Sequence, residues 1–198
     1  MNILVDLVPD SVEIDGIEYE LHSDFRTSIL FEMLMFDENV DDEEKVICAL
    51  ELYYPVCPKN IDEAIDKILW FYRGGKDVNL ATSGGKGKSA KEVYNFEYDD
   101  EYIYAAFLDQ YDIDLQDIEY LHWWKFKAMF KALKEDNEIS KIMSYRSMDI
   151  SKIKDKEQRE HYKKLKRMYE IPKSKNEVEK INEIENILLN SGDISKIL

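Results

Sequence analysis

Residues 82–89 read TSGGKGKS and end in the Gly-Lys-Ser triplet that closes a Walker A phosphate loop. In such a loop, backbone N–H groups wrap a phosphate, the lysine reaches the β- and γ-phosphates, and the serine holds magnesium. The motif needs a glycine five residues before Gly87, and this chain has Thr82 there. A buried strand should precede the loop and a helix should follow it, but neither flank has that pattern. We therefore interpret the stretch as a flexible loop and not as a nucleotide site.

The other residues that could hold a metal or act as nucleophiles are scattered. None of the CxxC, HxxxH or HExxH spacings of zinc sites occurs among His22, His122, His161, Cys48 and Cys57. No serine lies in a GxSxG sequence. Pairs of carboxylates are frequent, but they fall at expected helix starts, where acids complement the helix dipole. We expect no catalytic residue, no metal and no cofactor, and therefore no enzyme.

The charge of the chain is large and unevenly distributed. The formal net charge is −15, and residues 1–75 hold 18 acidic against 5 basic side chains. Residues 151–175 reverse this balance, with 10 basic against 4 acidic side chains. An acidic body repels phosphates, so we expect no nucleic-acid partner, although the body could mimic DNA.

No apolar run approaches the ~20 residues of a membrane span, and we expect no membrane partner. The N-terminal MNILVDLVPD lacks the basic start of a signal peptide, which favours the cytoplasm.

The hydrophobic pattern predicts a mainly α protein: a helical bundle with an N-terminal β-hairpin and a flexible Gly/Lys/Ser linker. Two alternating runs flank Asp15-Gly16, a dipeptide typical of tight hairpin turns. Ser23 or Asp24 can cap the first helix. Helical periodicity and capping residues predict helices over residues 24–36, 41–54, 61–73, 99–111, 114–136, 137–147, 151–169 and 176–190.

These elements divide the chain into four parts. Residues 1–75 hold the hairpin and the first helices, and residues 76–91 form the linker, which we expect to be mobile. Residues 92–172 form a helical part that completes the same core. Residues 173–198 form a C-terminal helical appendage.

The expected helix over 114–136 raises a question about its tryptophans. A rotation of 100° per residue puts Lys125 at the centre of the apolar arc, Trp123 at the margin of the polar side and Trp124 well within it. Two consecutive tryptophans should not both point into one core. Either a second layer, formed by the hairpin or by the helix over 24–36, covers Trp124, which we favour, or Trp124 anchors an interface. Lys125 should snorkel or pair with a carboxylate.

The expected first helix is apolar over residues 29–36 except at Glu32. A helix that is apolar almost all round has two neighbours, or a core on one side and a partner on the other. Flexible Met-rich surfaces accept many helix sequences. Candidate partner-binding residues are Met33, Met35, Phe36, Trp123, Trp124 and Lys125.

The basic segment after residue 151 has no apolar residue between Ile153 and Tyr162. Charges four residues apart can pair, as Asp155 with Arg159, and Glu160 with Lys156 or Lys164. A solvated helix is the default interpretation. The alternative is a docking surface for an acidic partner, including the acidic body of another copy, so self-association is possible.

Six aromatic-rich blocks follow one another along the chain. They are DFR at 24–26, LYYP at 52–55, WFY at 70–72, YIYAAF at 102–107, LHWWKF at 121–126 and IMSYR at 142–146. In this order they resemble the bacteriophage "gene product fifteen" family of long-tailed phages and prophages of Gram-positive bacteria, over roughly residues 1 to 172.

In such phages the family's gene lies beside that of the tape measure protein. The resemblance therefore implies a tail assembly chaperone that coats the tape measure protein in the host bacterial cytoplasm, and it carries over no binding or catalytic residue. Two alternatives stay open: an acidic inhibitor or DNA mimic that acts on a host protein, and a minor structural component of the tail.

Overall fold

The computed structural model describes residues 2–76 and 93–172. The phosphate-loop-like stretch, nearly all of the predicted linker, and the helix expected over 176–190 lie outside the described residues. The elements in chain order are β1 (Ser11–Ile14), β2 (Ile17–Glu20), α1 (Phe25–Phe36), α2 (Asp42–Tyr53), α3 (Ile61–Tyr72), α4 (Asp100–Tyr111), α5 (Trp123–Lys131), α6 (Glu138–Ser147), the 3-10 helix η2 (Ile150–Lys152) and α7 (Lys156–Met168). The prediction of a mainly helical chain with an N-terminal hairpin is confirmed.

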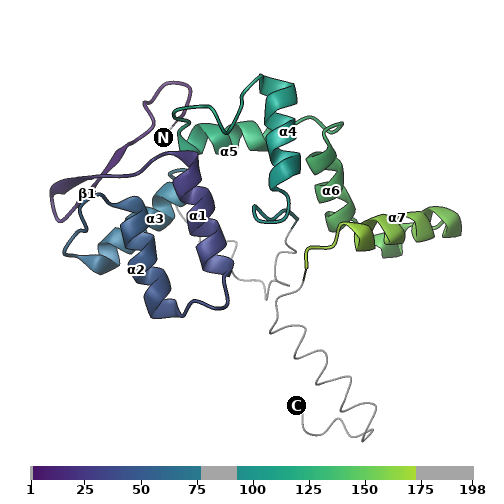
Figure 1. The fold of residues 1–198 in the computed structure, drawn as a ribbon, viewed down its shortest axis with the longest axis horizontal. Coiled ribbons are helices and arrows are strands. Elements are labelled where there is room, and N and C mark those ends of the chain that lie inside the picture. The colour runs from purple at the N-terminus through teal and green to yellow at the C-terminus, as the bar shows by residue number, and fades with distance from the viewer. Residues whose placement is uncertain (1, 77–92, 173–198) are drawn as a thin grey trace, which may run out of the picture.

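The hairpin forms at the predicted turn. Asp15 and Gly16 both have positive φ, 50° and 74°, as a two-residue turn that follows the strand twist requires. The strands pair in antiparallel register, with Ile14 opposite Ile17. Val12 and Ile14 are buried, and β1 contacts α3, so the hairpin covers this helix (Figure 1).

Side-chain caps begin the first three helices where the sequence predicts them. The Asp24 carboxylate accepts from the backbone N–H of Arg26 at 3.0 Å, and the Asp41 carboxylate accepts from that of Glu44 at 2.8 Å. The Asn60 side chain likewise accepts from a backbone N–H, at 3.3 Å. Each bond satisfies a donor that has no partner within its helix.

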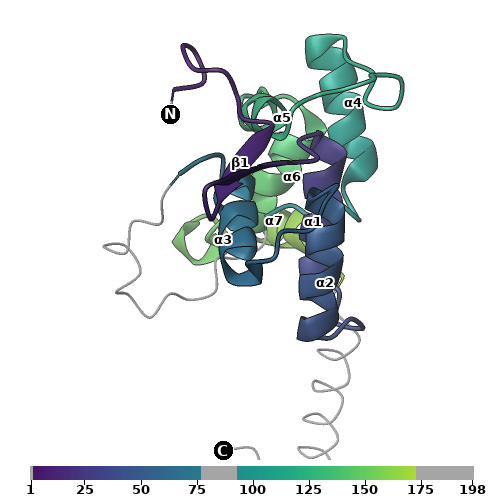
Figure 2. The ribbon, with the colours of Figure 1, turned by 90° about the vertical axis from the view of Figure 1, so that its left-hand side faces the viewer.

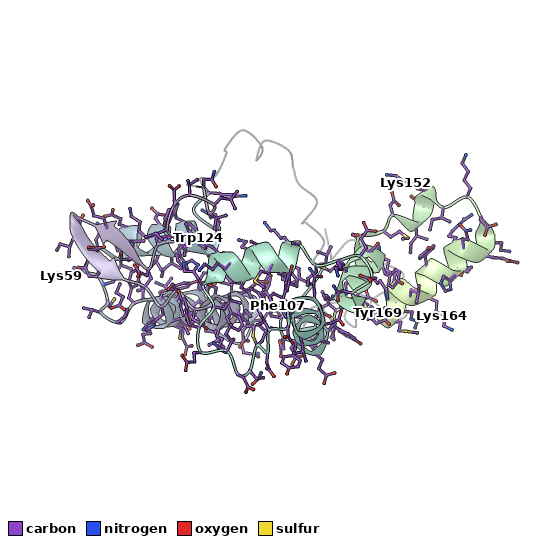
Figure 3. The ribbon with its side chains drawn as sticks, turned by 90° about the horizontal axis from the view of Figure 1, so that it is seen from above. Lys59, Phe107, Trp124, Lys152, Lys164 and Tyr169 are labelled. Carbon is purple, nitrogen blue, oxygen red and sulfur yellow. The ribbon has the colours of Figure 1, made fainter. Side chains whose placement is uncertain are left out.

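The molecule is long, with the hairpin and α1–α3 at one end and α7 at the other (Figure 1). Turning the view shows the N-terminal segment above β1 and α3, with the α1–α2 pair beside them (Figure 2). From above, Lys59 marks the hairpin end, and Lys152 and Lys164 mark the α7 end (Figure 3).

Phe126 on α5 joins the two described parts of the chain. Its ring is fully buried and stacks on Phe25 of α1 and on Phe107 of α4, with both centroid distances 4.8 Å. Aromatic stacks of this kind add to the free energy gained from burial alone. Residues from both sides of 77–92 therefore share one core.

The helix predicted over 114–136 is wrong over its first half, because α5 begins only at Trp123. Residues 121–123 instead run alongside residues 23–25. The backbone N–H of Phe25 donates to the carbonyl of Leu121 at 2.8 Å, and that of Trp123 donates to the carbonyl of Ser23 at 2.9 Å. Backbone groups used in this pairing cannot form helical bonds.

The helix predicted over 151–169 is also shorter than expected. It is divided into η2 and α7, and Asp155 caps α7 by accepting from the N–H of Gln158 at 2.8 Å.

Candidate interaction surfaces

The block LHWWKF starts α5 through its histidine. His122 is 1% exposed; its Nδ1 accepts from the backbone N–H of Trp124 at 3.0 Å, and its Nε2 lies 3.0 Å from the carbonyl of Pro9. These partners fix a neutral ring that carries its proton on Nε2. Burial lowers the pKa of His122, which favours the same neutral form. His122 therefore caps a helix.

Both tryptophans of the block bind the C-terminal end of α3. The indole N–H of Trp123 donates to the carbonyl of Tyr72 at 2.8 Å, and that of Trp124 donates to the carbonyl of Phe71 at 2.7 Å. The last carbonyls of a helix have no partner within the helix. The LHWWKF block therefore completes the hydrogen bonds of the WFY block.

This arrangement corrects the expectation that Trp123 and Trp124 could not both be buried. They are 2% and 5% exposed. Both are covered because α5 is short and its first turn lies between α3 and the stacked rings of Phe25, Phe126 and Phe107. A second layer does cover Trp124, but it is α3 and not the expected hairpin or first helix: the rings of Trp70 and Phe71 lie 5.5 and 5.8 Å from it. Neither tryptophan is an exposed anchor.

Gly75 is the residue that lets the ring of Trp124 pack against the C-terminal end of α3. Its φ is +70°, and a Cβ added there would lie 2.5 Å from Cη2 of Trp124. Gly74, with φ +81°, would find nothing within 4 Å. Backbone conformation favours glycine at both positions, but only Gly75 is also restricted by a neighbouring side chain.

Lys127 lies at the same helix end. Its ammonium donates to the carbonyl of Tyr72 at 2.8 Å and lies 5.1 and 5.5 Å from the ring centroids of Tyr72 and Trp123. A cation at a helix C-terminus is stabilised by the dipole, but burial has the larger effect and lowers the pKa of Lys127 to about 8. Tyr72 in turn donates its hydroxyl to the Glu32 carboxylate, which accounts for the one acid within the apolar run of α1.

A cavity of about 320 Å³ lies beside Lys127, and aromatic rings form much of its wall. Val93, the first residue described after 77–92, is part of the wall. The aromatic residues that line it are Tyr72, Tyr94, Phe96, Trp123, Phe126 and Phe130.

The block IMSYR contributes a buried ion pair. The Arg146 guanidinium donates to both carboxylate oxygens of Asp99, at 2.5 and 2.9 Å, and the two side chains are 7% and 1% exposed. Arg146 also donates to the carbonyls of Tyr169 and Val93. These bonds join α6 to the start of α4 and to the residue that follows α7.

The remaining blocks also form internal contacts. Arg26 donates to the carbonyls of Leu115 and Ile118, both at 2.8 Å, and thereby holds the irregular segment before α5. The hydroxyl of Tyr54 donates to the carbonyl of Ala64 at 2.9 Å, which ties α2 to α3. The six blocks therefore build the core, and the candidate interaction surface lies outside them.

The other residues that the sequence suggested for partner binding differ in their exposure to solvent. Met33 is partly buried against the core, whereas Met35 and Phe36 are 37% and 59% exposed. Lys125, expected at the centre of the apolar arc, is exposed instead, because the late start of α5 changes which of its faces meets the core.

Exposed apolar side chains gather where α1 ends and α2 begins. We call this the α1–α2 corner and define it by Met35, Phe36, Val46 and Ile47. Val46 and Ile47 are 38% and 57% exposed, and the ammonium of Lys45 donates to the carbonyl of Met35 at 3.0 Å, which brings the two helix ends together. Residues 35–47 include six acidic side chains and one basic one. The sequence pattern had drawn attention to the α1 half and missed Val46 and Ile47.

Helix α7 forms the opposite end of the molecule and has no buried residue. None of the three i,i+4 pairs predicted for it reaches ion-pair distance within the described part of the chain. The carboxylate of Asp155 is used in capping, and exposed side chains in water gain little from holding one geometry.

No helix in residues 2–76 and 93–172 is long and apolar enough to cross a membrane. In the same residues, no three His, Cys, Asp or Glu side chains lie close enough to hold a metal ion. In a comparison with known families, the model of the family described as "Bacteriophage Gp15 protein" matches residues 4–171. No curated protein and no solved structure matches the chain.

Proposed function

The chain belongs to the Bacteriophage Gp15 protein family, and from this premise we propose that it is a non-catalytic tail assembly chaperone. Its client is the tape measure protein of the same phage, which it binds in the host bacterial cytoplasm before the tail tube forms. It needs no cofactor. This proposal rests on what the family resemblance implies and on the surface of the chain.

The observation that supports it is the α1–α2 corner. Many large apolar side chains of the described residues are packed into the core, whereas Phe36 on α1 and Ile47 on α2 are among those that stay more than half exposed. An apolar patch of this kind marks a site where another surface docks. An amphipathic helix of the client can bury its apolar side chains there.

The acids around the corner select among such helices. Residues 35–47 hold a large excess of acidic side chains, so a helix with basic residues beside its apolar stripe is preferred over an acidic one. Because the contact combines apolar burial with charge attraction, high salt should weaken the complex without abolishing it.

The test is co-expression with the tape measure protein, followed by size-exclusion chromatography with light scattering. We expect a soluble complex with several copies of this chain per client. The variant Phe36→Ser/Ile47→Ser should bind the client at least tenfold more weakly, since full burial of each side chain contributes about 1.5–3 kcal/mol. Val56→Ser/Leu108→Ser, which changes two exposed apolar residues elsewhere, is the matched control and should bind normally.

Other results would reject the chaperone role. If the client remains insoluble and this chain elutes alone, the proposal fails. Salt-sensitive capture of a basic, nucleic-acid-binding host protein would support the acidic inhibitor instead. Recovery of the chain from purified virions would make it a structural tail component.

A further inference from the structure

Among residues 2–76 and 93–172, helix α7 is held to the molecule along the edge that faces α6 and η2. It contacts α6 and η2, where the rings of Tyr145 and Tyr162 lie 6.3 Å apart and the ammonium of Lys166 donates to the carbonyl of Met148 at 2.6 Å. No residue of α7 is buried. The rest of its surface faces solvent at the end of the molecule (Figure 3).

The exposed surface of α7 is strongly basic. Residues 156–168 hold six Lys and Arg against two Glu. Among the described residues, no ion pair involves Lys163, Lys164 or Arg167. Met168 beside them is 61% exposed. The helix therefore presents cations that no described acid neutralises, together with an exposed apolar side chain.

The α1–α2 corner is its counterpart in both respects. It combines exposed apolar side chains with six acids against one base, and that base, Lys45, is bound to the carbonyl of Met35. In Figure 1 the corner lies on the lower side of the half that holds α1–α3, whereas α7 lies at the far end of the other half; α7 packs against α6 and η2 and is separated from the corner of its own chain. Complementary charges on two separate faces favour contact between chains.

We propose that copies of this protein associate head to tail, with α7 of one copy docked on the α1–α2 corner of a second copy. Such a contact uses two different surfaces, and each added copy presents a free corner or a free α7. The copies therefore form an open chain or close into a ring. This inference rests on charge and exposure and does not depend on the chaperone role.

Two charge-reversed variants test the contact. Lys163→Glu/Lys164→Glu leaves residues 156–168 with four basic and four acidic side chains, so that α7 loses its net positive charge. Glu38→Lys/Glu43→Lys leaves residues 35–47 with four acidic and three basic side chains, so that the corner loses most of its net negative charge. Lys59→Glu/Lys134→Glu changes the net charge as the first variant does, at exposed positions outside both faces, and serves as the control. The purified full-length chains are measured by light scattering over a range of protein and salt concentrations.

At low salt the unmodified chain should show a mass above the 23.5 kDa of one copy, falling toward it as salt screens the charges. Each reversed variant should associate at least tenfold more weakly, and the control should behave like the unmodified chain. An equimolar mixture of the two reversed variants should form pairs again, because the unmodified α7 of the corner variant then meets the unmodified corner of the α7 variant.

A neutral variant distinguishes loss of charge from loss of the helix. Lys163→Gln/Lys164→Gln keeps good helix formers in place, so its circular dichroism should be unchanged while its association weakens. The proposal is overturned if this variant associates fully, if the unmodified chain stays monomeric at low salt, or if the mixture stays monomeric. Binding of duplex DNA by a monomeric chain, lost on Lys163→Glu/Lys164→Glu, would assign α7 to nucleic acid and also overturn it.

Discussion

Gly75→Ala tests how the WFY and LHWWKF blocks fit together. The new methyl group would lie 2.5 Å from Cη2 and 3.0 Å from Cζ2 of Trp124, on backbone with φ +70°. Two costs therefore add. The left-handed conformation costs a non-glycine residue about 1–2 kcal/mol, and overpacking against the indole costs about 1–3 kcal/mol.

The chain supplies the controls that separate these costs. Gly74→Ala meets the same backbone restriction at φ +81° with nothing within 4 Å, so it should cost only the conformational part, about 1–2 kcal/mol. In a Trp124→Phe background the clashing ring atoms are absent. Gly75→Ala should then cost no more than Gly74→Ala, which gives a favourable coupling of about 1–3 kcal/mol between positions 75 and 124.

The assay is urea unfolding followed by circular dichroism, with free energies of unfolding for all four members of the cycle. Trp124→Phe alone should destabilise the fold by about 1–3 kcal/mol, because it loses the hydrogen bond to the carbonyl of Phe71 and leaves a small void. Equal effects of Gly75→Ala in both backgrounds would refute the contact between Gly75 and Trp124.

Three further results are expected. Asp99→Asn should lower the free energy of unfolding by about 3–5 kcal/mol, because it leaves the buried guanidinium of Arg146 without its counter-charge; urea midpoints measure this, and an effect below 1 kcal/mol would contradict it. Lys127 has a folded pKa of about 8 against an ordinary value of 10.5, so the unfolded chain binds more protons in that window and stability should rise by about 2 kcal/mol from pH 7.5 to 9.5. Lys127→Met should lack this rise, and an identical pH profile would exclude Lys127 as its source. If copies associate through the α1–α2 corner, the Lys163→Glu/Lys164→Glu chain should bind the tape measure protein more tightly than the unmodified chain in titrations, and unchanged affinity would separate the two contacts.

Local chemistry made part of the fold predictable. A tight turn needs residues that tolerate positive φ, and Asp15-Gly16 supplies them. Helix starts need a side chain that accepts from the first turn, and Asp24, Asp41 and Asn60 do so. The helix bounds that follow from these residues agree with the structure to within one or two residues because neither signal depends on distant parts of the chain.

The candidate surface was predictable only in part. The apolar run of the first helix drew attention to Met35 and Phe36, which are exposed. Ile47 escaped notice because it lies on an ordinary amphipathic helix, where an exposed apolar residue looks like part of the core face. The pattern of one helix does not say which of its apolar residues a neighbour covers.

The sequence by itself determined the hairpin, most helices and the separation of acidic and basic segments, because each follows from neighbours along the chain. Only the tertiary structure decided where the helix of the LHWWKF block begins and where its two tryptophans lie. Residues 23–25 form the backbone hydrogen bonds of Leu121 and Trp123, so α5 begins late, and both indole N–H groups donate to the last carbonyls of α3. Periodicity assumes a continuous helix, and the partner that interrupts this one lies almost 100 residues earlier in the chain.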